Sequence, residues 1–453
     1  MLEEIIAEGA FGIVFEKISR ESVHLIKRNI LDSYAGILGS LLDTGMLSNF
    51  DALASLAPDE KGINVWGVNR KAHILEALFM NCILARRSDL LNTYLSSNNM
   101  GGSHPSDNVS LVLSLADAFG TTGREVLLTT YLAFRLSCDF AEFFHPEKGD
   151  FDHDALALLY TSLVASHFLG LSKEKMVQAQ RIAGAMGLGT NQAALGVVTE
   201  WKHCTYASCA VRGMLAAFLA RSGFEGPIDI YEGEAGIKRF VPWDKDAEKP
   251  NPELERIIFK RWPALVFVQT AIDAALVLAP QVADCGEIER VEVRTYKKAI
   301  EESAFSSAVY HPETRAGITH SMPCCVALAL IEKKPEFRHF DPSYFEGSPA
   351  LKELVPKVKV LEDSGMTALF PDKSPVEITI TRKDGSVFST RLDYPRGDPH
   401  DPLTDAEIEE KVLAYAAPAL PPEEAKAIIQ KIWNLENEQD IRFLLFPLKK
   451  RRL

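Results

Sequence analysis

Apolar positions recur at helical spacing through roughly the first 264 residues of the chain. The clearest example follows Ser19, a residue type that is typical of a helix N-cap. The apolar residues that follow it three or four positions apart are Val23, Ile26, Ile30, Leu31, Tyr34, Ile37 and Leu38. This spacing predicts a helix. The same criteria predict further helices over residues 72–91, 109–118, 123–136, 152–169 and 204–222, with Ser172 capping one more.

The pattern changes near Pro263, and alternation with a period of two becomes frequent after it. Such alternation is typical of strands with one buried face. It predicts strands over residues 289–296, 357–361, 376–381 and 387–392. The dipeptide Asp384-Gly385 separates the last two, and Asp-Gly is a turn signal that indicates a β-hairpin. Between the strands, an apolar run over residues 319–332 with Pro323 in its first turn predicts a helix.

A capping box opens the last part of the chain. Thr404 is followed three residues later by Glu407, which is the arrangement that begins a helix, and the sequence stays helical to about residue 443. Residues 395–402 hold three prolines and one glycine, a composition typical of an irregular connection. We therefore expect the chain to cross between two domains at this point.

These patterns predict a mainly α protein of two domains. With 453 residues, 47% of them apolar, the chain can bury a large core without disulfide or metal support. We expect a large all-helical domain that is built from both ends of the chain and a smaller α+β domain inserted into it. The predicted boundaries are 1–264 and 403–453 for the helical domain, and 265–402 for the inserted one.

Composition narrows the classes of partner and location. The formal net charge of −13 disfavours nucleic acid as a partner, because phosphates require a basic face. No segment reaches the roughly 18 consecutive apolar residues of a membrane span, and the N-terminus lacks the pattern of a signal peptide. Seven scattered cysteines without a Cys-x-x-Cys pair favour reduced thiols over a zinc or iron–sulfur site. We therefore expect a cytoplasmic protein, or a mitochondrial matrix protein if a leader has been removed.

The segment from residue 89 to residue 108 carries the densest group of candidate catalytic residues. Asp89 and Thr93 precede a loop rich in glycine and serine, and His104 follows that loop directly before a proline. A proline holds the preceding residue in an extended conformation, and an imidazole titrates near neutrality, which suits general acid–base catalysis. The alternative is that residues 103–108 form only a polar loop that caps the next helix.

Two basic segments lie further along the chain. Lys202 precedes a predicted helix N-terminus, whose dipole favours anions, although a surface lysine is the alternative interpretation. Lys260 and Arg261 lie beside Trp262 at the predicted domain boundary, and clefts between domains are common ligand sites. An ordinary linker with a buried tryptophan is the alternative there.

The remaining histidines form weaker patterns. We expect His320 to begin a helix or to fill the core rather than to act in catalysis. The spacing of Asp139, Glu142, His145 and His153 fits neither a tetrahedral zinc site nor an EF-hand. The sequence therefore predicts no metal.

The order of these motifs resembles the MmgE/PrpD family, which includes 2-methylcitrate dehydratase, cis-aconitate decarboxylase and iminodisuccinate epimerase. The resemblance runs over nearly the whole chain. The matching pieces are residues 30–36, Asp89 with Thr93 and Tyr94, residues 104–108, Lys202, residues 259–263, residues 310–315, residues 320–323 and the turn at 384–385. It implies an α+β lid inserted into a helical domain, a homodimer, and a site between the domains that handles small polycarboxylates without metal or cofactor.

The resemblance also implies which side chains act. By residue type, the active-site positions of the family fall on Asp89, Thr93, His104, Lys202 and Lys260. We expect His104 to transfer protons, Asp89 to orient it or raise its pKa, and Thr93 to supply a neutral hydrogen bond. The two lysines would hold the charge that develops when a proton next to a carboxylate is removed. The residues expected to bind substrate are Arg261, Ser106, Tyr94 and His203.

The reaction that the resemblance implies is the dehydration of 2-methylcitrate, or of a related hydroxy-tricarboxylate, to a cis-aconitate-type product. Decarboxylation of cis-aconitate, epimerisation of an imino-dicarboxylate and binding without turnover are alternatives on the same scaffold. Departures from the family pattern keep these alternatives open. Leu90, Leu91 and Asn92 stand where aromatic and acidic residues are common, and Cys82 and Ser103 stand where glycine is usual.

Overall fold

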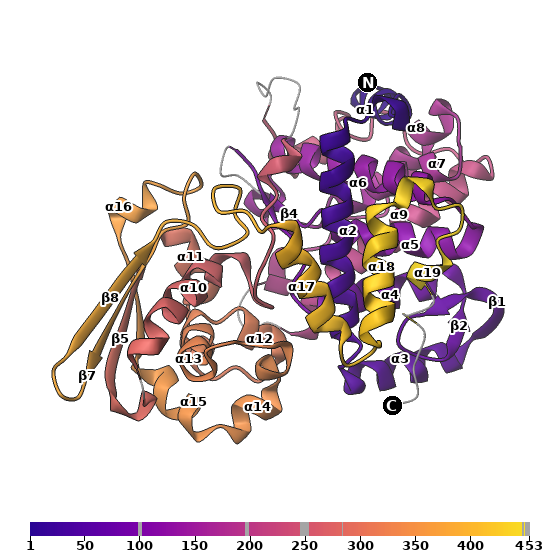
Figure 1. Ribbon diagram of the computed structural model, residues 1–453. Helices are drawn as coiled ribbons and strands as arrows, with labels where there is room; N and C mark the ends of the chain where they lie inside the picture. Colours follow the sequence, from indigo (N-terminus) through magenta and orange to yellow (C-terminus); the bar gives the residue numbers. More distant parts are fainter. Residues whose placement is uncertain (98–101, 195–198, 245–252, 283, 446–447, 449–453) are drawn as a thin grey trace.

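The computed structural model describes the whole chain except residues 98–101, 195–198, 245–252, 283, 446–447 and 449–453. The molecule is mainly helical and has two parts (Figure 1). Buried apolar side chains form three clusters. Two of them lie in the part of the molecule that we call the body. The third is formed by residues between Trp262 and Leu392 and lies in the part that we call the lid. Both ends of the chain belong to the body.

Several helices of the body begin where the sequence offers a cap. Ser19 accepts a hydrogen bond from the backbone of Ser22, Ser172 caps a later helix in the same way, and Thr404 with Glu407 forms the predicted capping box. The body helices are α1 (Leu2–Phe11), α2 (Arg20–Ser40), α3 (Thr44–Leu56), α4 (Ile74–Arg87), α5 (Asp107–Phe119), α6 (Gly123–Phe143), α7 (Ala157–Phe168), α8 (Lys173–Gly184), α9 (Thr205–Arg221), α17 (Asp405–Ala416), α18 (Pro422–Trp433) and α19 (Arg442–Leu445).

The body is not all-helical, which corrects one expectation. It contains two small antiparallel sheets, formed by β1 (Pro58–Val65) with β2 (Arg70–Ala72) and by β3 (Tyr94–Leu95) with β4 (Gly102–Ser103). Ala72, expected to begin a helix, instead pairs with Ile63, and α4 begins two residues later. Strands of two or three residues are too short to show a period in the sequence.

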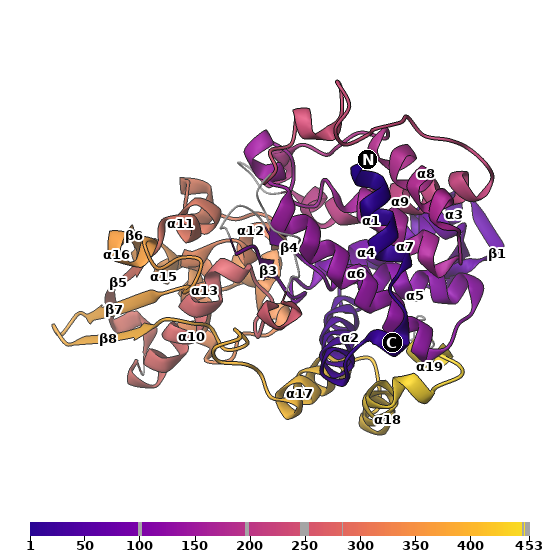
Figure 2. The same cartoon turned by 90° about the horizontal axis from the view of Figure 1, so that it is seen from above.

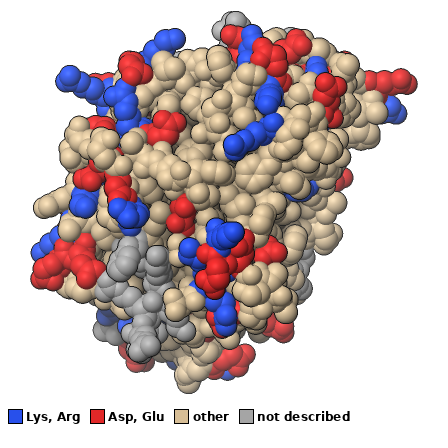
Figure 3. All heavy atoms as spheres, turned by 90° about the vertical axis from the view of Figure 1, so that its right-hand side faces the viewer, with Lys and Arg blue, Asp and Glu red and all other residues tan. Residues whose placement is uncertain are grey.

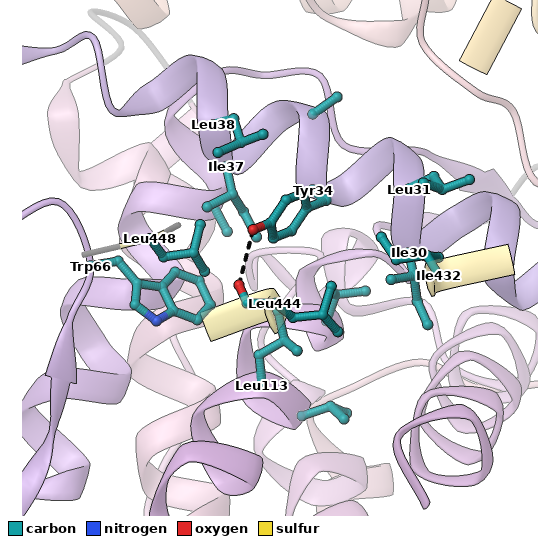
Figure 4. Packing of buried hydrophobic residues seen from close by; sticks show 14 of the residues in the cluster. Ile30, Leu31, Tyr34, Ile37, Leu38, Trp66, Leu113, Ile432, Leu444 and Leu448 are labelled. Atoms are coloured by element: carbon teal, nitrogen blue, oxygen red, sulfur yellow. Dashed lines mark hydrogen bonds between the residues drawn. The ribbon is translucent and has the colours of Figure 1, made fainter. Parts of the chain in front are cut away.

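The C-terminal helices complete the core around α2. The hydroxyl of Tyr34 donates to the carbonyl of Leu444 at 3.0 Å (Figure 4). Apolar side chains from α2, from the C-terminal helices and from the β1–β2 connection form one buried cluster there, and it includes Ile30, Trp66, Ile432 and Leu448. This cluster joins helix α2, near the N-terminus, to the C-terminal helices. The body is therefore one continuous unit, and the lid is an insertion in its sequence.

The lid is built on a four-stranded sheet of order β6-β5-β7-β8. In it β5 (Ile288–Thr295) is parallel to β6 (Val358–Glu362) and antiparallel to β7 (Val376–Arg382), which forms a hairpin with β8 (Val387–Leu392). The inward face of β5 and β7, with Val291, Val293, Ile378 and Ile380, is buried in the cluster that also holds α10 and α13. The sheet lies on the side of the lid away from the body (Figures 1 and 2).

Short helices connect the strands of the lid. They are α10 (Gln269–Leu278), α11 (Lys297–Ser303), α12 (Arg315–Thr319), α13 (Met322–Glu332), α14 (Pro342–Gly347), α15 (Pro349–Leu354) and α16 (Ser364–Thr367). The helix predicted over residues 319–332 is confirmed as α13, although it begins only at Met322, where Ser321 caps it. His320 lies between α12 and α13, next to the helix start expected for it, and it lines the cavity between body and lid.

The chain crosses between body and lid twice, and the two crossings lie side by side. The backbone N–H of Phe259 donates to the carbonyl of Gly397 at 2.9 Å. Asp273 of α10 joins the same region, because its carboxylate accepts from the indole of Trp262 and from the backbone of Arg396, both at 2.8 Å. These contacts set the position of the residues just after Phe259, including Lys260.

The surface carries charge of both signs. On the face of the body drawn in Figure 3, basic and acidic side chains are interspersed rather than separated. Among the described residues of that face, basic side chains form no continuous stripe of the kind that follows a phosphate backbone. Among the described residues, no helix combines the length and the apolar character that crossing a bilayer would need.

Substitution of Gly397 tests whether close packing of the two crossings contributes to stability. Its φ of 103° is disfavoured for alanine, and a Cβ there would lie 2.0 Å from the carbonyl oxygen of Phe259. We therefore expect Gly397→Ala to lower the free energy of unfolding by about 3 kcal/mol in urea titration. Gly347→Ala is the matched control, because a Cβ there has open space. Equal stability of the two variants would contradict this account.

Candidate active site

A cavity of about 500 Å³ lies between the body and the lid. The body lines it mainly with ionisable side chains, and the lid adds one histidine, several charged residues and an apolar wall. The ionisable residues on the body side include Arg86, Asp89, His104, His153, Lys202 and His203. A concave site with convergent ionisable groups is the usual form of an active site.

A buried ion pair lies beneath this cavity. Asp89 follows α4 with a left-handed φ of 53°, which aspartate tolerates better than most residues. Nζ of Lys260 donates to Oδ1 of Asp89 at 2.7 Å and to its carbonyl oxygen at 3.2 Å. The two segments are aligned by Thr93 and Ile258, whose backbones exchange hydrogen bonds of 3.0 and 2.8 Å. Lys411 of α17 then donates to the carbonyl of Lys260 at 2.6 Å, which ties the pair to the C-terminal helices.

Burial and charge act in opposite directions on this pair. Burial alone would raise the pKa of Asp89, but the Lys260 ammonium, with a smaller effect from His320, holds that pKa well below its usual range. Burial lowers the pKa of Lys260, and Asp89 opposes that change. Oδ2 of Asp89 has no hydrogen-bond partner among the described residues, and Nδ1 of His320 lies 3.7 Å from it. Asp89 therefore stays ionised and presents one uncommitted oxygen to His320.

His104 is held by one edge of its ring. Its Nδ1 lies 2.8 Å from the backbone carbonyl of Asn92 and 3.2 Å from the hydroxyl oxygen of Thr93. A carbonyl can only accept, so Nδ1 carries the hydrogen and Nε2 carries the lone pair. Asn92 is fixed in turn by Ser106, with two hydrogen bonds of 3.0 Å between them. Nε2 has no protein partner in the described part of the chain, and the ring lines the cavity.

The surroundings of His104 keep it neutral. Burial is the largest cause that lowers its pKa well below the usual value, and the positive charges of Arg86 and Lys260 lower it further. The ring of His153 meets it edge to face, with ring centroids 5.3 Å apart. The site therefore contains an imidazole that is unprotonated at neutral pH and that has a free basic nitrogen.

His153 lies between two carboxylates and two cations. Its Nδ1 is 3.6 Å from Asp152 and 3.4 Å from Nζ of Lys202, whereas its Nε2 is 3.3 Å from Asp154 and 3.4 Å from Arg86. Each ring nitrogen thus faces one group that accepts and one group that donates. Each nitrogen can therefore donate or accept a hydrogen bond, which suits a group that passes a proton.

The cations of the cavity are already paired with carboxylates. Arg86 contacts Asp107, and its Nη1 lies 3.8 Å from Asp154. Nζ of Lys202 lies 3.4 Å from Asp152. Burial acts against ionisation of Asp152, yet Lys202 and then His153 bring its pKa down to about 2. The pairing holds the basic side chains in fixed directions before any ligand arrives.

The structure brings together most of the residues expected to be catalytic. Asp89, Thr93, His104 and Lys202 line the cavity, and so does His203 from the substrate-binding group. Lys260 lies beneath the cavity, covered by Asp89, rather than in its lining. The expectation that Asp89 orients His104 or raises its pKa is wrong, because Asp89 bonds Lys260 and the pKa of His104 is lowered.

Three of the residues expected to bind substrate lie outside the cavity lining. Arg261 is exposed, with its guanidinium 5.1 Å from the ring centroid of Trp262. Ser106 is buried and committed to Asn92, and the hydroxyl of Tyr94 donates to Glu142 at 2.7 Å. These contacts give Arg261, Ser106 and Tyr94 structural roles. Part of the predicted loop, residues 98–101, lies outside the described residues.

Sequence reasoning missed several ionisable residues that line the cavity, among them Arg86, His153 and His320. Arg86 sits in the last turn of α4 with no distinguishing motif. The sequence places His153 only in a metal pattern whose spacing does not fit, and it predicts His320 only as a helix-start or core residue. The signal for His153 was its place between two aspartates, since α7 begins at Ala157 and leaves residues 152–154 free to turn toward Lys202.

Asp152, His153 and Asp154 bring one potential metal-ligand atom each within 4.8 Å of one another. Their environment is unfavourable for a cation, because Lys202 and Arg86 already occupy the space beside the carboxylates. In this arrangement the three residues contact the side chains of Lys202 and Arg86. Independence from metal remains a prediction for this chain, tested below with a chelator.

Comparison with known proteins gives consistent matches over most of the sequence. Residues 4–249 match the family model described as the MmgE/PrpD N-terminal domain, and residues 262–437 match the MmgE/PrpD C-terminal domain. The chain is 25% identical to cis-aconitate decarboxylase of Homo sapiens, in an alignment that covers 99% of this chain and 94% of that protein. It is 26% identical to 2-methylcitrate dehydratase of Escherichia coli (strain K12), with 74% of each chain covered. Identity to 2-methylcitrate dehydratase of Cupriavidus necator is 24%, covering 81% of this chain and 80% of that protein.

The ion pair beneath the cavity generates a stability prediction. Asp89→Asn should lower the free energy of unfolding at pH 7 by about 3–5 kcal/mol, because it leaves the Lys260 ammonium buried without a counter-charge. Asp89→Asn combined with Lys260→Met should cost clearly less than the two single changes added together. Because the folded pKa of Asp89 is lowered, the difference between wild type and Asp89→Asn should be largest above about pH 4 and shrink as the pH falls. Strict additivity in urea titrations would contradict the pairing.

Proposed function

The chain belongs to the MmgE/PrpD family, and from that premise we propose that it is a lyase that acts on small polycarboxylates. The leading reaction is the dehydration of 2-methylcitrate, or of a related hydroxy-tricarboxylate, to a cis-aconitate-type product. One observation carries this proposal. A neutral imidazole, His104, has a free nitrogen in a cavity that also presents the cations Arg86 and Lys202. The relatives named as dehydratases support the same reaction class.

His104 is the proposed base. Its Nδ1–H is committed to Asn92, so Nε2 accepts the proton from the carbon next to a substrate carboxylate. The C–H bond breaks, its electron pair forms the new C=C bond, and the C–O bond on the neighbouring carbon breaks. The lowered pKa of His104 keeps the ring unprotonated before substrate binds, and the negative charge of a bound substrate would raise that pKa during the reaction.

Lys202 and Arg86 are proposed to hold the substrate carboxylates. Nζ of Lys202 has three donors, and its contacts to Asp152 and His153 are both 3.4 Å, so it can turn a donor toward a ligand. Lys260 cannot reach substrate while Asp89 covers it. We therefore propose that Lys260 is a positioning residue, which fixes Asp89 and adds positive potential beneath the cavity.

The hydroxyl that leaves needs a proton, and His153 is the proposed donor. It adjoins the ring of His104, and each of its nitrogens faces both an acceptor and a donor. The proton on its ring can therefore pass to the departing oxygen, which leaves as water. Asp152 and Asp154 would hold the ring of His153 in place for that transfer.

Decarboxylation of cis-aconitate is the second candidate. Its support is the similarity to the human decarboxylase, which spans 99% of this chain. In that reaction the C–CO₂⁻ bond breaks, carbon dioxide leaves, and the electron pair left on carbon is protonated. The same cations and the same pair of imidazoles would serve it, so the product distinguishes the two candidates.

His104→Asn tests the base directly. Asparagine can keep a donor toward the Asn92 carbonyl but has no basic nitrogen, so we expect kcat to fall by about 10²- to 10⁴-fold. Citrate, 2-methylcitrate and cis-aconitate would be incubated with enzyme in the presence of a chelator, and double-bond absorbance, carbon dioxide and optical activity followed together. His24→Asn, a largely exposed histidine of α2, is the control.

The three readouts separate the candidates. Absorbance that rises despite the chelator supports the dehydratase, and carbon dioxide release supports the decarboxylase. A change confined to optical activity would indicate an epimerase. No change in absorbance, carbon dioxide or optical activity would contradict the proposal, and so would full activity of His104→Asn.

Substrate binding should take up protons. A polycarboxylate adds negative charge beside His320, whose pKa burial lowers to about 4 in the free protein. That charge should raise the pKa of His320, so the complex holds more protons than the free protein and affinity rises as the pH falls. Between about pH 7 and pH 5 we expect log Kd for 2-methylcitrate to fall by up to about one unit per pH unit for one proton. Calorimetry in buffers of different ionisation enthalpy measures the uptake, and proton release would contradict the assignment.

A further inference from the structure

The lid contributes an apolar wall to the cavity that the proposed reaction does not use. Leu265 and Val266 line it from the segment that precedes α10, and three aromatic rings continue it: Phe267, Tyr296 and Phe370. None of these side chains can neutralise a carboxylate. A tricarboxylate held by Lys202 and Arg86 alone would leave the wall facing water.

The three rings pack as one unit although they come from separate segments of the lid. Tyr296 and Phe370 are stacked, with centroids 4.6 Å apart and planes at 11°. Phe267 meets both edge to face, at 6.4 Å from Tyr296 and 6.1 Å from Phe370. Next to them, the backbone N–H of Lys297 donates to the hydroxyl of Thr367 at 3.0 Å, which ties the start of α11 to α16. The wall is thus a defined surface.

The wall adjoins the polar floor of the site directly. The backbone N–H of Leu265 donates to the carbonyl of Thr319 at 3.0 Å. The next residue, His320, lies 3.7 Å from Asp89 through its Nδ1. Nδ1 of His320 is 2.8 Å from the carbonyl of Ala316, so this part of the lid is held in place. A ligand whose carboxylates lie near Lys202 can therefore extend along the wall without leaving the cavity.

From this arrangement we propose that the substrate is a hydroxy-polycarboxylate that carries an apolar substituent longer than a methyl group, seated against Phe267 and Phe370, with the buried ring of Tyr296 behind them. The inference rests on the proposed function and adds the substrate class to it. A volume of about 500 Å³ lies within the range of sites that enclose drug-sized ligands, which is more than a citrate-sized acid fills. Charged lid residues also line the cavity, and Nζ of Lys298 lies 6.0 Å from the ring centroid of Phe267. That ammonium is paired with Glu302 at 2.7 Å, so its charge is already balanced beside the wall.

The test is a homologous series of ligands: citrate and its 2-methyl, 2-ethyl, 2-propyl and 2-butyl derivatives. Affinity measured by calorimetry should rise by about fourfold for each methylene that the wall covers, and kcat/KM should rise with it. In Phe267→Ala the ratio of butyl to methyl affinity should fall at least fivefold. Phe305→Ala, an exposed phenylalanine of the lid outside the cavity, should keep the wild-type ratio.

The outcomes separate this inference from the proposed function. If citrate and 2-methylcitrate bind and react but affinity is flat or falls with chain length, the substrate class is overturned and the lyase proposal stands. If no member of the series binds, the proposed function fails and the inference fails with it. If Phe267→Ala keeps the wild-type ratio while longer chains bind better, the wall is not the cause and its assignment is overturned.

Discussion

The buried ion pair between Asp89 and Lys260 is the contact on which the site depends, because it joins residues 171 positions apart at the junction of body and lid. A buried charge without a partner costs several kcal/mol, so neither segment can shift alone. The exchange of hydrogen bonds between Thr93 and Ile258 and the support of Lys411 are consequences of that requirement. His104 is held by residues 92–93, in the same stretch of chain, so the ion pair and the proposed base share one rigid segment.

Local signals in the sequence predicted much of the fold, and the exceptions have physical causes. Caps such as Ser19 and the alternation over residues 376–381 are properties of adjacent residues, so α2 and β7 were predictable. The strands β1 to β4 were not, because most are too short to show a period. The body is therefore less uniformly helical than expected, although the protein is mainly α as predicted.

The candidate site was predictable to the extent that motifs mark it. Residue types and order led to Asp89, Thr93, His104 and Lys202, which the structure brings to one cavity. The positions of Arg261 and His320 depend on tertiary packing. Arg261 turns outward against Trp262, and His320 turns inward because a cap at the next residue interrupts the helix. Neither direction can be derived from neighbouring residues alone.

The cavity has a charged floor from the body and an apolar wall from the lid. The central step of the proposed reaction is the transfer of a proton to His104 from the carbon beside a carboxylate. The most direct measurement of that step is proton NMR of 2-methylcitrate and cis-aconitate incubated with the enzyme in deuterium oxide. The account predicts that, with wild type, the hydration or decarboxylation product of cis-aconitate carries deuterium at the carbon next to a carboxylate, because that carbon receives its proton from the enzyme in D₂O. Recovered 2-methylcitrate should carry it to the extent that the proton transfer reverses, and neither should with His104→Asn. Undiminished deuterium incorporation by the variant, or no incorporation by wild type, would contradict it.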